Sequence, residues 1–209
     1  VPISFTELRQ LALIFAQITD AKSPYTGEHS LCVAHLARFL AGQAGLSSET
    51  CAKIEVAGLL HDLGKLRVPD EILKKPGPLT AEERAMIQRH SFETYQILRG
   101  ITGLEDITMW AAFHHETLDG RGYPFHRRGE ELTIEMRIIA VADVFQALAQ
   151  QRPYREPTSP TQILETLRAF ARDNRLDGEV VELVGRHLQE SWQVATGREE
   201  SLHYQHSYS

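Results

Sequence analysis

Helical periodicity dominates this sequence from one end to the other. Apolar residues recur at intervals of three and four, which is the spacing of one face of an α-helix. Ser4 with Glu7 and Thr80 with Glu83 each form the capping pattern that is typical of a helix N-terminus. No alternating run is long enough to predict a sheet, although a small hairpin between residues 119 and 131 is compatible with the pattern. The sequence therefore predicts an all-α fold.

The helical segments have recognisable starts and stops. We expect helices over about residues 26–44, 80–100, 104–116, 160–172 and 178–195, and further helices that begin after Ser4, after Ser47 and near Thr133. In the helix that begins after Ser4, the apolar stripe is expected to consist of Leu8, Leu11, Phe15 and Ile18.

The division of the chain follows from its length and composition. A chain of 209 residues is long enough for one sizeable core, and its composition does not change before about residue 195. We expect an N-terminal helix within residues 1–23, one that could link to an upstream domain of a longer protein. A single domain over residues 24–195 and a polar, disordered tail over residues 196–209 are expected to follow.

Charge and composition narrow the class of protein. The formal net charge of -6 leaves no sequence-wide basic field for polymeric nucleic acid or an anionic membrane, so an anionic substrate would need local cations. No apolar run is long enough to span a bilayer, and the first residues do not have the order of a signal peptide. Cys32 and Cys51 have no CxxC spacing, which fits reduced thiols and predicts a cytoplasmic protein with no membrane insertion.

Seven ionisable side chains fall on inward faces or at the ends of the predicted helices. One buried histidine is usually a hydrogen-bonded core residue, but the whole set is unusual for a plain core. Burying the carboxylate of Asp143 costs several kcal/mol unless a cation compensates it, and no Lys or Arg lies in its stripe. The set therefore predicts a metal site formed by His29, His61, Asp62, His90, His114, His115 and Asp143.

The chemistry of this donor set limits the metal. Imidazole and carboxylate ligands suit iron, manganese, zinc, cobalt or nickel, and the lack of cysteine argues against an iron-sulfur or structural zinc site. Two adjacent metals would use all seven ligands. The carboxylate of Asp62 could bridge the two cations while His61 binds one, and Lys65 could reach a bound phosphate.

Two segments resemble the signatures of a known family. His61-Asp62-Leu63-Gly64-Lys65 resembles the HD signature, and His114-His115-Glu116-Thr117-Leu118-Asp119-Gly120-Arg121-Gly122-Tyr123-Pro124 resembles the extended GYP motif. The likeness to the HD-GYP family runs from about residue 24 to about residue 188. It implies a single-domain HD-type helical bundle, with a metal site among the helices and a GYP loop.

The resemblance also implies an activity. HD-GYP proteins are metal-dependent phosphodiesterases that open cyclic di-GMP to linear pGpG, and in some cases produce GMP, by a hydroxide that bridges the metals. Carried over by position, it implies the seven ligands above, two divalent ions that are Fe or Mn, and catalytic roles for Lys65 and Asp62. It further implies substrate contacts by Tyr123, Arg152 and Arg155, and an upstream regulatory domain or a diguanylate cyclase as partner.

Several positions depart from the family pattern. Tyr25 stands where members with three metals have a glutamate, so we predict two metals here. Cys32 replaces an arginine and Gln146 an aspartate, and we predict that these two are partners that were replaced together, which leaves no lone buried charge. Thr94 replaces a common glycine with an effect on packing alone, and Glu116 is expected to orient an imidazole.

Two other functions stay open from the sequence. Another HD-type phosphohydrolase, acting on a nucleotide monophosphate, a deoxynucleoside triphosphate or a guanosine alarmone, would share the His-Asp pair, but the GYP motif argues against it. A module that senses nucleotides or binds a partner without turnover would explain the changes at Cys32 and Gln146, but the complete ligand set argues against it.

Overall fold

The computed structural model describes residues 3–23, 28–150 and 158–197. Within these residues there is no β-strand, which confirms the all-α prediction, and the segment 119–131 holds only a short 3₁₀ turn instead of a hairpin. Its elements are α1 Phe5–Lys22, α2 His29–Gln43, α3 Ser48–Leu60, η1 Leu63–Arg67, α4 Asp70–Leu73, α5 Ala81–Gln88, α6 His90–Leu98, α7 Glu105–Ala112, η2 Gly129–Glu131, α8 Ile134–Ala149, α9 Pro160–Arg172, α10 Gly178–Arg186 and α11 Leu188–Ala195. No helix in these described ranges is long and apolar enough to cross a membrane.

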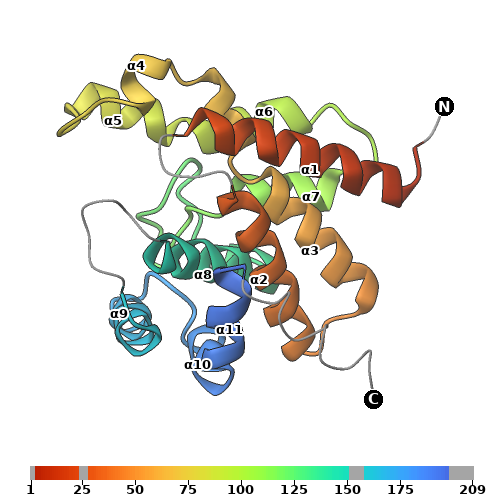
Figure 1. The fold of residues 1–209 in the computed structure, drawn as a ribbon, viewed down its shortest axis with the longest axis vertical. Coiled ribbons are helices and arrows are strands. Elements are labelled where there is room, and N and C mark those ends of the chain that lie inside the picture. Colours follow the sequence, from red (N-terminus) through yellow and green to blue (C-terminus); the bar gives the residue numbers. More distant parts are fainter. Residues whose placement is uncertain (1–2, 24–27, 151–157, 198–209) are drawn as a thin grey trace.

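Helix α2 is central in the fold (Figure 1). It packs against α3 on one side and α8 on another. Helices α9, α10 and α11 lie together at the lower end of the molecule in the view of Figure 1. The α2–α3–α8 core includes Leu36, Leu40, Ile54, Ile139 and Phe145, none of which has measurable exposure. The apolar stripes that the sequence predicted are thus packed against one another. This packing brings the start of α2, the end of α3 and the middle of α8 close together.

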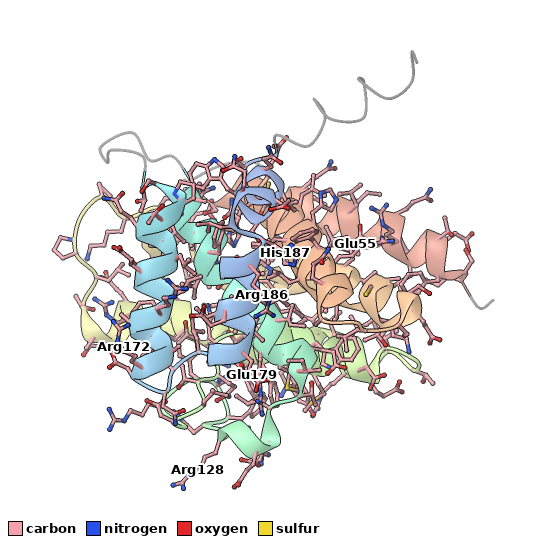
Figure 2. The ribbon with its side chains drawn as sticks, turned by 90° about the horizontal axis from the view of Figure 1, so that it is seen from below. Glu55, Arg128, Arg172, Glu179, Arg186 and His187 are labelled. Carbon is pink, nitrogen blue, oxygen red and sulfur yellow. The ribbon has the colours of Figure 1, made fainter. Side chains whose placement is uncertain are left out.

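The helix predicted from about residue 26 begins at His29, whereas the other predicted helix starts are confirmed. Two predicted helices are each divided. Capping boxes form at Ser4 with Glu7 and at Thr80 with Glu83. The segment 80–100 breaks at Arg89 into α5 and α6. The segment 178–195 breaks into α10 and α11 at His187, which is labelled in Figure 2. The predicted inward face holds beyond the break, where His90, Thr94 and Leu98 are buried, but not before it, where Met86 is exposed.

The prediction for the first helix is wrong for three of the four residues of its apolar stripe, since only Leu8 is partly buried against the core. Leu11, Phe15 and Ile18, which were expected to face the core, are 45%, 43% and 50% exposed. The buried face lies about 100° further around the helix and consists of Ala12, Ala16 and Thr19, one residue on from each of these side chains, together with Asp20. Small side chains let α1 approach its neighbours closely, and the polar anchors of the helix also lie on that side.

Those anchors are two buried carboxylates. Glu55 of α3 accepts hydrogen bonds from Arg9 of α1, at 2.8 Å to Nε, and from Arg38 of α2. Burial would raise the pKa of Glu55, but these two guanidinium groups lower it overall. Asp20 accepts from the backbone N–H of Ser30 at 2.9 Å and from its hydroxyl at 2.7 Å. Both interactions join α1 to α2 or α3, and Glu55 is labelled in Figure 2.

Candidate metal centre

The structure brings all seven predicted ligands to one place. They come from five separate parts of the chain, since His29 begins α2, His61 and Asp62 follow α3, His90 begins α6, His114 and His115 follow α7, and Asp143 lies within α8. Their donor atoms form three overlapping groups, each within 4.8 Å, namely His29 with His61 and Asp143, His61 with Asp62 and His114, and His90 with His114 and His115.

A close backbone contact joins the His61–Asp62 segment to α6. A Cβ on Gly64 would lie 1.9 Å from the carbonyl oxygen of His90, so only glycine fits there. The hydroxyl of Thr94 accepts from the N–H of Gly64 at 2.9 Å and donates to the carbonyl of His61 at 3.1 Å. Thr94 was expected to affect packing alone, but it also bridges the two segments that carry His61 and His90.

The first imidazole pair is His29 and His61, whose Nε2 atoms are 3.3 Å apart. The Nδ1 of His61 donates to the backbone carbonyl of Gly58 at 2.7 Å, and the Nδ1 of His29 donates to Oε1 of Gln146 at 2.5 Å. With the proton on Nδ1, each Nε2 presents a lone pair to the other. Asp143 Oδ1 lies 3.3 Å from His29 Nε2 and 3.7 Å from His61 Nε2.

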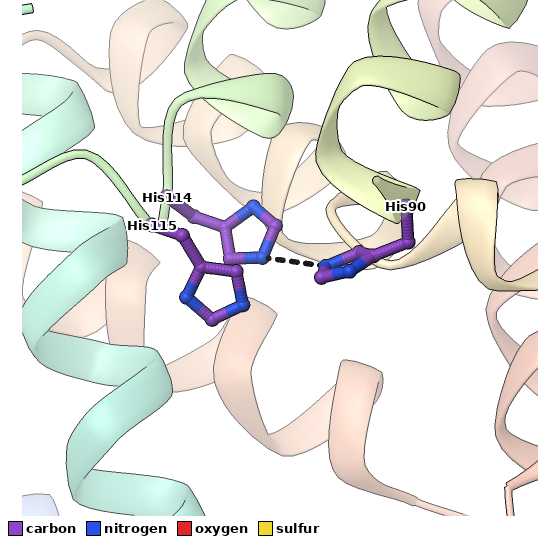
Figure 3. A group of neighbouring side chains, drawn as sticks. All are labelled: His90, His114 and His115. Carbon is purple, nitrogen blue, oxygen red and sulfur yellow. Dashed lines mark hydrogen bonds between the residues drawn. The ribbon is translucent and has the colours of Figure 1, made fainter. Parts of the chain in front are cut away.

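The second imidazole pair is His90 and His114, and their Nε2 atoms are also 3.3 Å apart (Figure 3). Both Nδ1 atoms donate to backbone carbonyls, that of Ile87 at 2.6 Å and that of Ala111 at 2.7 Å. This pair therefore repeats the arrangement of the first, with two bare Nε2 atoms facing each other. The ring of His115 lies beside that of His114, with ring centres 4.0 Å apart and ring planes tilted by 46°.

The carboxylate of Asp62 lies between the two pairs. Its Oδ2 is 3.6 Å from His29 Nε2 and 3.4 Å from His61 Nε2, and its Oδ1 is 3.2 Å from His90 Nε2. One oxygen thus faces each pair, which is the geometry that a bridging carboxylate requires.

This donor set fits two divalent cations. Facing lone pairs repel each other unless a cation lies between them. Donors bound to one transition metal at about 2.1 Å lie roughly 3.0–3.5 Å apart, a range that includes most of these separations. Asp62 and Asp143 are both nearly inaccessible to solvent, and Lys65 is the one Lys or Arg of the described residues that forms an ion pair with either of them. A single ammonium group leaves buried negative charge that metal ions would neutralise.

The electrostatics of the cage agree with this fit. Burial and neighbouring imidazoles hold the pKa of His114 well below its usual range, and burial lowers the pKa of His115 to about 3. Burial would also lower the pKa of His29, but Asp143 and Asp62 raise it to about 9. Burial would raise the pKa of Asp143, but His29 and its neighbours lower it. His114, His115 and Asp143 are thus held in the basic forms that bind metal, whereas His29 holds a proton that a bound metal ion would displace.

A cavity of about 210 Å³ opens beside Asp62 and Asp143. Lys65 lies in its wall, with Nζ 2.5 Å from Oδ2 of Asp62, and the charge of Asp62 raises the pKa of Lys65 against the opposing effect of burial. The sequence analysis did not predict the other polar residues of the wall, Thr19, Asp20, Ser23 and Gln150. The small-residue spacing of Ala12 and Ala16 was the available signal, because it marks the face of α1 to which Thr19 and Asp20 belong.

The GYP loop is held by Glu116, but not in the expected way. Both oxygens of Glu116 accept backbone N–H groups, from Phe125 at 2.6 Å and from Arg127 at 2.9 Å. The expectation that Glu116 orients an imidazole is therefore wrong, because its two carboxylate oxygens bind backbone N–H groups of the loop instead. A Cβ on Gly122 would lie 2.4 Å from the carbonyl oxygen of His115, and this close approach places the ring of Tyr123 4.8 Å from that of His115.

The remaining predicted residues divide into two groups. Tyr25, Arg152 and Arg155 lie outside the described residues, as does nearly all of the predicted tail. Cys32 is buried about one helical turn after His29, and the Nδ1 of His29 donates a hydrogen bond to Gln146. Both exchanged positions therefore lie near the same predicted metal ligand. Their predicted joint replacement is compatible with this placement and stays a prediction.

Comparison with known proteins identifies the family. Residues 14–180 match the HD domain. The chain belongs to the HD domain family, and it is of the HD-GYP type. It is 41% identical over 189 residues to the 3'3'-cGAMP-specific phosphodiesterase 1 of Vibrio cholerae, an alignment that covers 90% of this chain and 44% of the relative.

Other relatives agree with this assignment. The cyclic di-GMP phosphodiesterase response regulator RpfG of Xanthomonas campestris pv. campestris is 44% identical over 59% of this chain and 33% of its own length. An HDG"Y"P protein from Bdellovibrio bacteriovorus shares the fold, with a TM-score of 0.64 at 16% identity over 88% of this chain and 63% of that structure. This HD-GYP chain spans less than half the length of the curated relatives that it matches.

Proposed function

We propose that this chain is the catalytic domain of a metal-dependent phosphodiesterase that opens a cyclic dinucleotide. The observation that carries the proposal is the position of Asp62 between two pairs of imidazoles with bare Nε2 atoms. His29, His61 and Asp143 would hold one ion and His90, His114 and His115 the other, with Asp62 shared between them. Two bound divalent cations would supply activation of water and neutralise charge on the phosphoryl oxygens.

The chain's own residues would bind and orient the substrate beside this centre. Lys65 projects an ammonium group into the cavity, where it can contact a phosphoryl oxygen as charge develops on it. The half-buried ring of Tyr123 rests on His115, which leaves its hydroxyl to fix the pose by a hydrogen bond. Arg152 and Arg155 are proposed as further phosphate contacts, in keeping with the resemblance of their segment to the family.

The relatives favour one substrate for the first test. Three relatives named 3'3'-cGAMP-specific phosphodiesterases match 90%, 74% and 87% of this chain at 39–41% identity. Relatives named for cyclic di-GMP match 59–73% at 34–44% identity. The sequence analysis expected cyclic di-GMP, and we now place 3'3'-cGAMP ahead of it within the same proposed reaction.

Other parts of the sequence-based interpretation remain proposals. We propose Fe or Mn as the native metal, since imidazole and carboxylate donors suit both. A regulatory domain or a diguanylate cyclase as partner rests on the resemblance to the family. A cytoplasmic site of action rests on the spacing of Cys32 and Cys51, which fits reduced thiols.

The decisive experiment incubates the protein, loaded with Mn²⁺ or Fe²⁺, with 3'3'-cGAMP and cyclic di-GMP in separate reactions. Products are separated by chromatography, and bound metal is measured on the same sample. We expect a linear dinucleotide in at least one reaction and two metal equivalents per chain. A fully loaded protein that binds these ligands without turnover would support the sensing function instead. Activity limited to nucleotide monophosphates, deoxynucleoside triphosphates or alarmones would support the other hydrolase.

A further inference from the structure

The histidines of the cage differ in what holds their Nδ1 atoms. His61, His90 and His114 each donate to the backbone carbonyl three residues earlier, at 2.7, 2.6 and 2.7 Å. Each of these carbonyls lies in the last turn of α3, α5 or α7, where the helix leaves its carbonyls without an internal partner. The backbone therefore fixes the tautomer and the ring orientation of these three imidazoles.

His29 cannot be held in that way. It is the first residue of α2, so no carbonyl of its own helix lies three residues before it. Its Nδ1 instead donates to the side-chain oxygen of Gln146, which is 2.5 Å away in α8 and is only 4% exposed. Gln146 follows Asp143 by three residues, so one face of α8 contacts both nitrogens of the His29 ring.

We propose that Gln146 is the positioning residue for His29, and that it does with a side chain what backbone carbonyls do for His61, His90 and His114. By accepting a hydrogen bond from Nδ1–H, Gln146 keeps the Nε2 of a neutral His29 without a proton and turned towards His61 and Asp143. Of these four histidines His29 is the one whose tautomer a single substitution can change. The inference rests on the proposed metal-binding role of His29 and does not depend on the substrate.

Because Gln146 is an amide, its effect on the tautomer of His29 depends on which way the amide is turned. An ionised carboxylate at this position could only accept a hydrogen bond, which would enforce the Nδ1–H tautomer. A glutamine that rotated its amide by 180° would donate to Nδ1, and Nε2 would then carry the proton and could not bind a cation. Gln146→Glu removes this second possibility with little change in shape. Gln146→Met removes the acceptor with little change in volume.

The test measures binding of Zn²⁺ alone by competition with a chelator. We expect Gln146→Met to weaken binding roughly 10- to 100-fold at one of two equivalents, the usual effect of losing the partner of a metal-binding histidine. Gln146→Glu should bind as tightly as the original protein or more tightly. Gln43→Met, an exposed glutamine in the same helix as His29, is the matched control and should bind normally. Unchanged affinity in Gln146→Met would overturn the proposal.

A spectroscopic measurement separates positioning from general packing. In the Zn²⁺-loaded protein, NMR should show a slowly exchanging Nδ1 proton for His29, assigned by its loss in His29→Asn. That signal should vanish in Gln146→Met and persist in Gln146→Glu, while helical circular dichroism stays the same in all variants. Persistence of the signal in Gln146→Met would contradict the proposal. Neither readout uses a cyclic dinucleotide, so a failure of the proposed enzymatic function would be seen separately.

Discussion

The metal cage and the outer face of α1 depart from the usual pattern of burial in opposite directions. The cage places two carboxylates and several imidazoles in the interior, and α1 turns Leu11, Phe15 and Ile18 to the surface. Inside the cage, every donor has partners among the other described residues. Bound cations would remove the repulsion between the facing Nε2 lone pairs and between the two carboxylates. For the outer face of α1 the described residues contain no covering element.

The difference shows which interactions decide the orientation of a helix. Polar anchors fix α1, since Arg9 joins it to Glu55 and Asp20 joins it to Ser30. Each anchor forms a hydrogen bond to a buried group that would be expensive to leave unpaired, whereas an exposed apolar side chain forgoes only about 1.5–3 kcal/mol. Two buried polar anchors can therefore outweigh the gain from turning the larger apolar residues inward.

The largest effect should come from the centre of the cage. Asp62→Asn keeps the shape of the side chain but removes the charge that faces both imidazole pairs. We expect a loss of at least about 1,000-fold in kcat/KM together with reduced metal content, because the shared ligand is lost. Asp173→Asn, at the C-terminal end of α9, is a matched control and should leave both quantities unchanged. Normal turnover in Asp62→Asn would remove Asp62 from the centre of the mechanism.

The sequence predicted the cage better than the surface around it, for a physical reason. Buried charges such as Asp62 and Asp143 are so unfavourable alone that their placement on inward stripes already implies compensation. The break at Arg89 and the role of Gln146 depend instead on contacts between helices that are distant in sequence. The unexpected choice of the buried face of α1 has the same origin, since Glu55 and Ser30 act as its anchors and neither lies within the first helix.

Removing the anchor of α1 should produce the next largest effect. Glu55→Gln leaves Arg9 and Arg38 without their charged partner, and we expect about 3 kcal/mol of destabilisation at pH 7. Denaturant unfolding measures it. A value below about 0.5 kcal/mol would mean that α1 is held by its small-residue face alone.

The same variant predicts a pH dependence. The folded-state pKa of Glu55 is lowered, so its contribution is present above the unfolded value near 4.5 and is lost as pH falls through the folded pKa. The stability difference between the original protein and Glu55→Gln should therefore shrink between pH 6 and pH 3. A difference that does not change with pH would argue that Glu55 is uncharged in the folded protein.

An intermediate effect should come from the two exchanged positions beside His29. Cys32→Arg or Gln146→Asp alone introduces a buried charge, and each should destabilise the metal-free protein by about 2 kcal/mol. If the two positions are partners, the double variant should recover at least about 1 kcal/mol relative to the sum of the single variants. Urea unfolding of all four proteins gives the coupling energy, and strict additivity would show that the two positions are independent.

The smallest effect is expected on the outer face of α1. Ile18 is half exposed, so Ile18→Glu should change the free energy of unfolding by no more than about 0.5 kcal/mol. Ala16→Leu, two residues earlier on the buried face, should cost about 1–3 kcal/mol because the added volume has no space. Urea unfolding at low protein concentration compares the two variants. A larger loss in Ile18→Glu than in Ala16→Leu would mean that the apolar face is covered after all, and the contrast with the cage would then disappear.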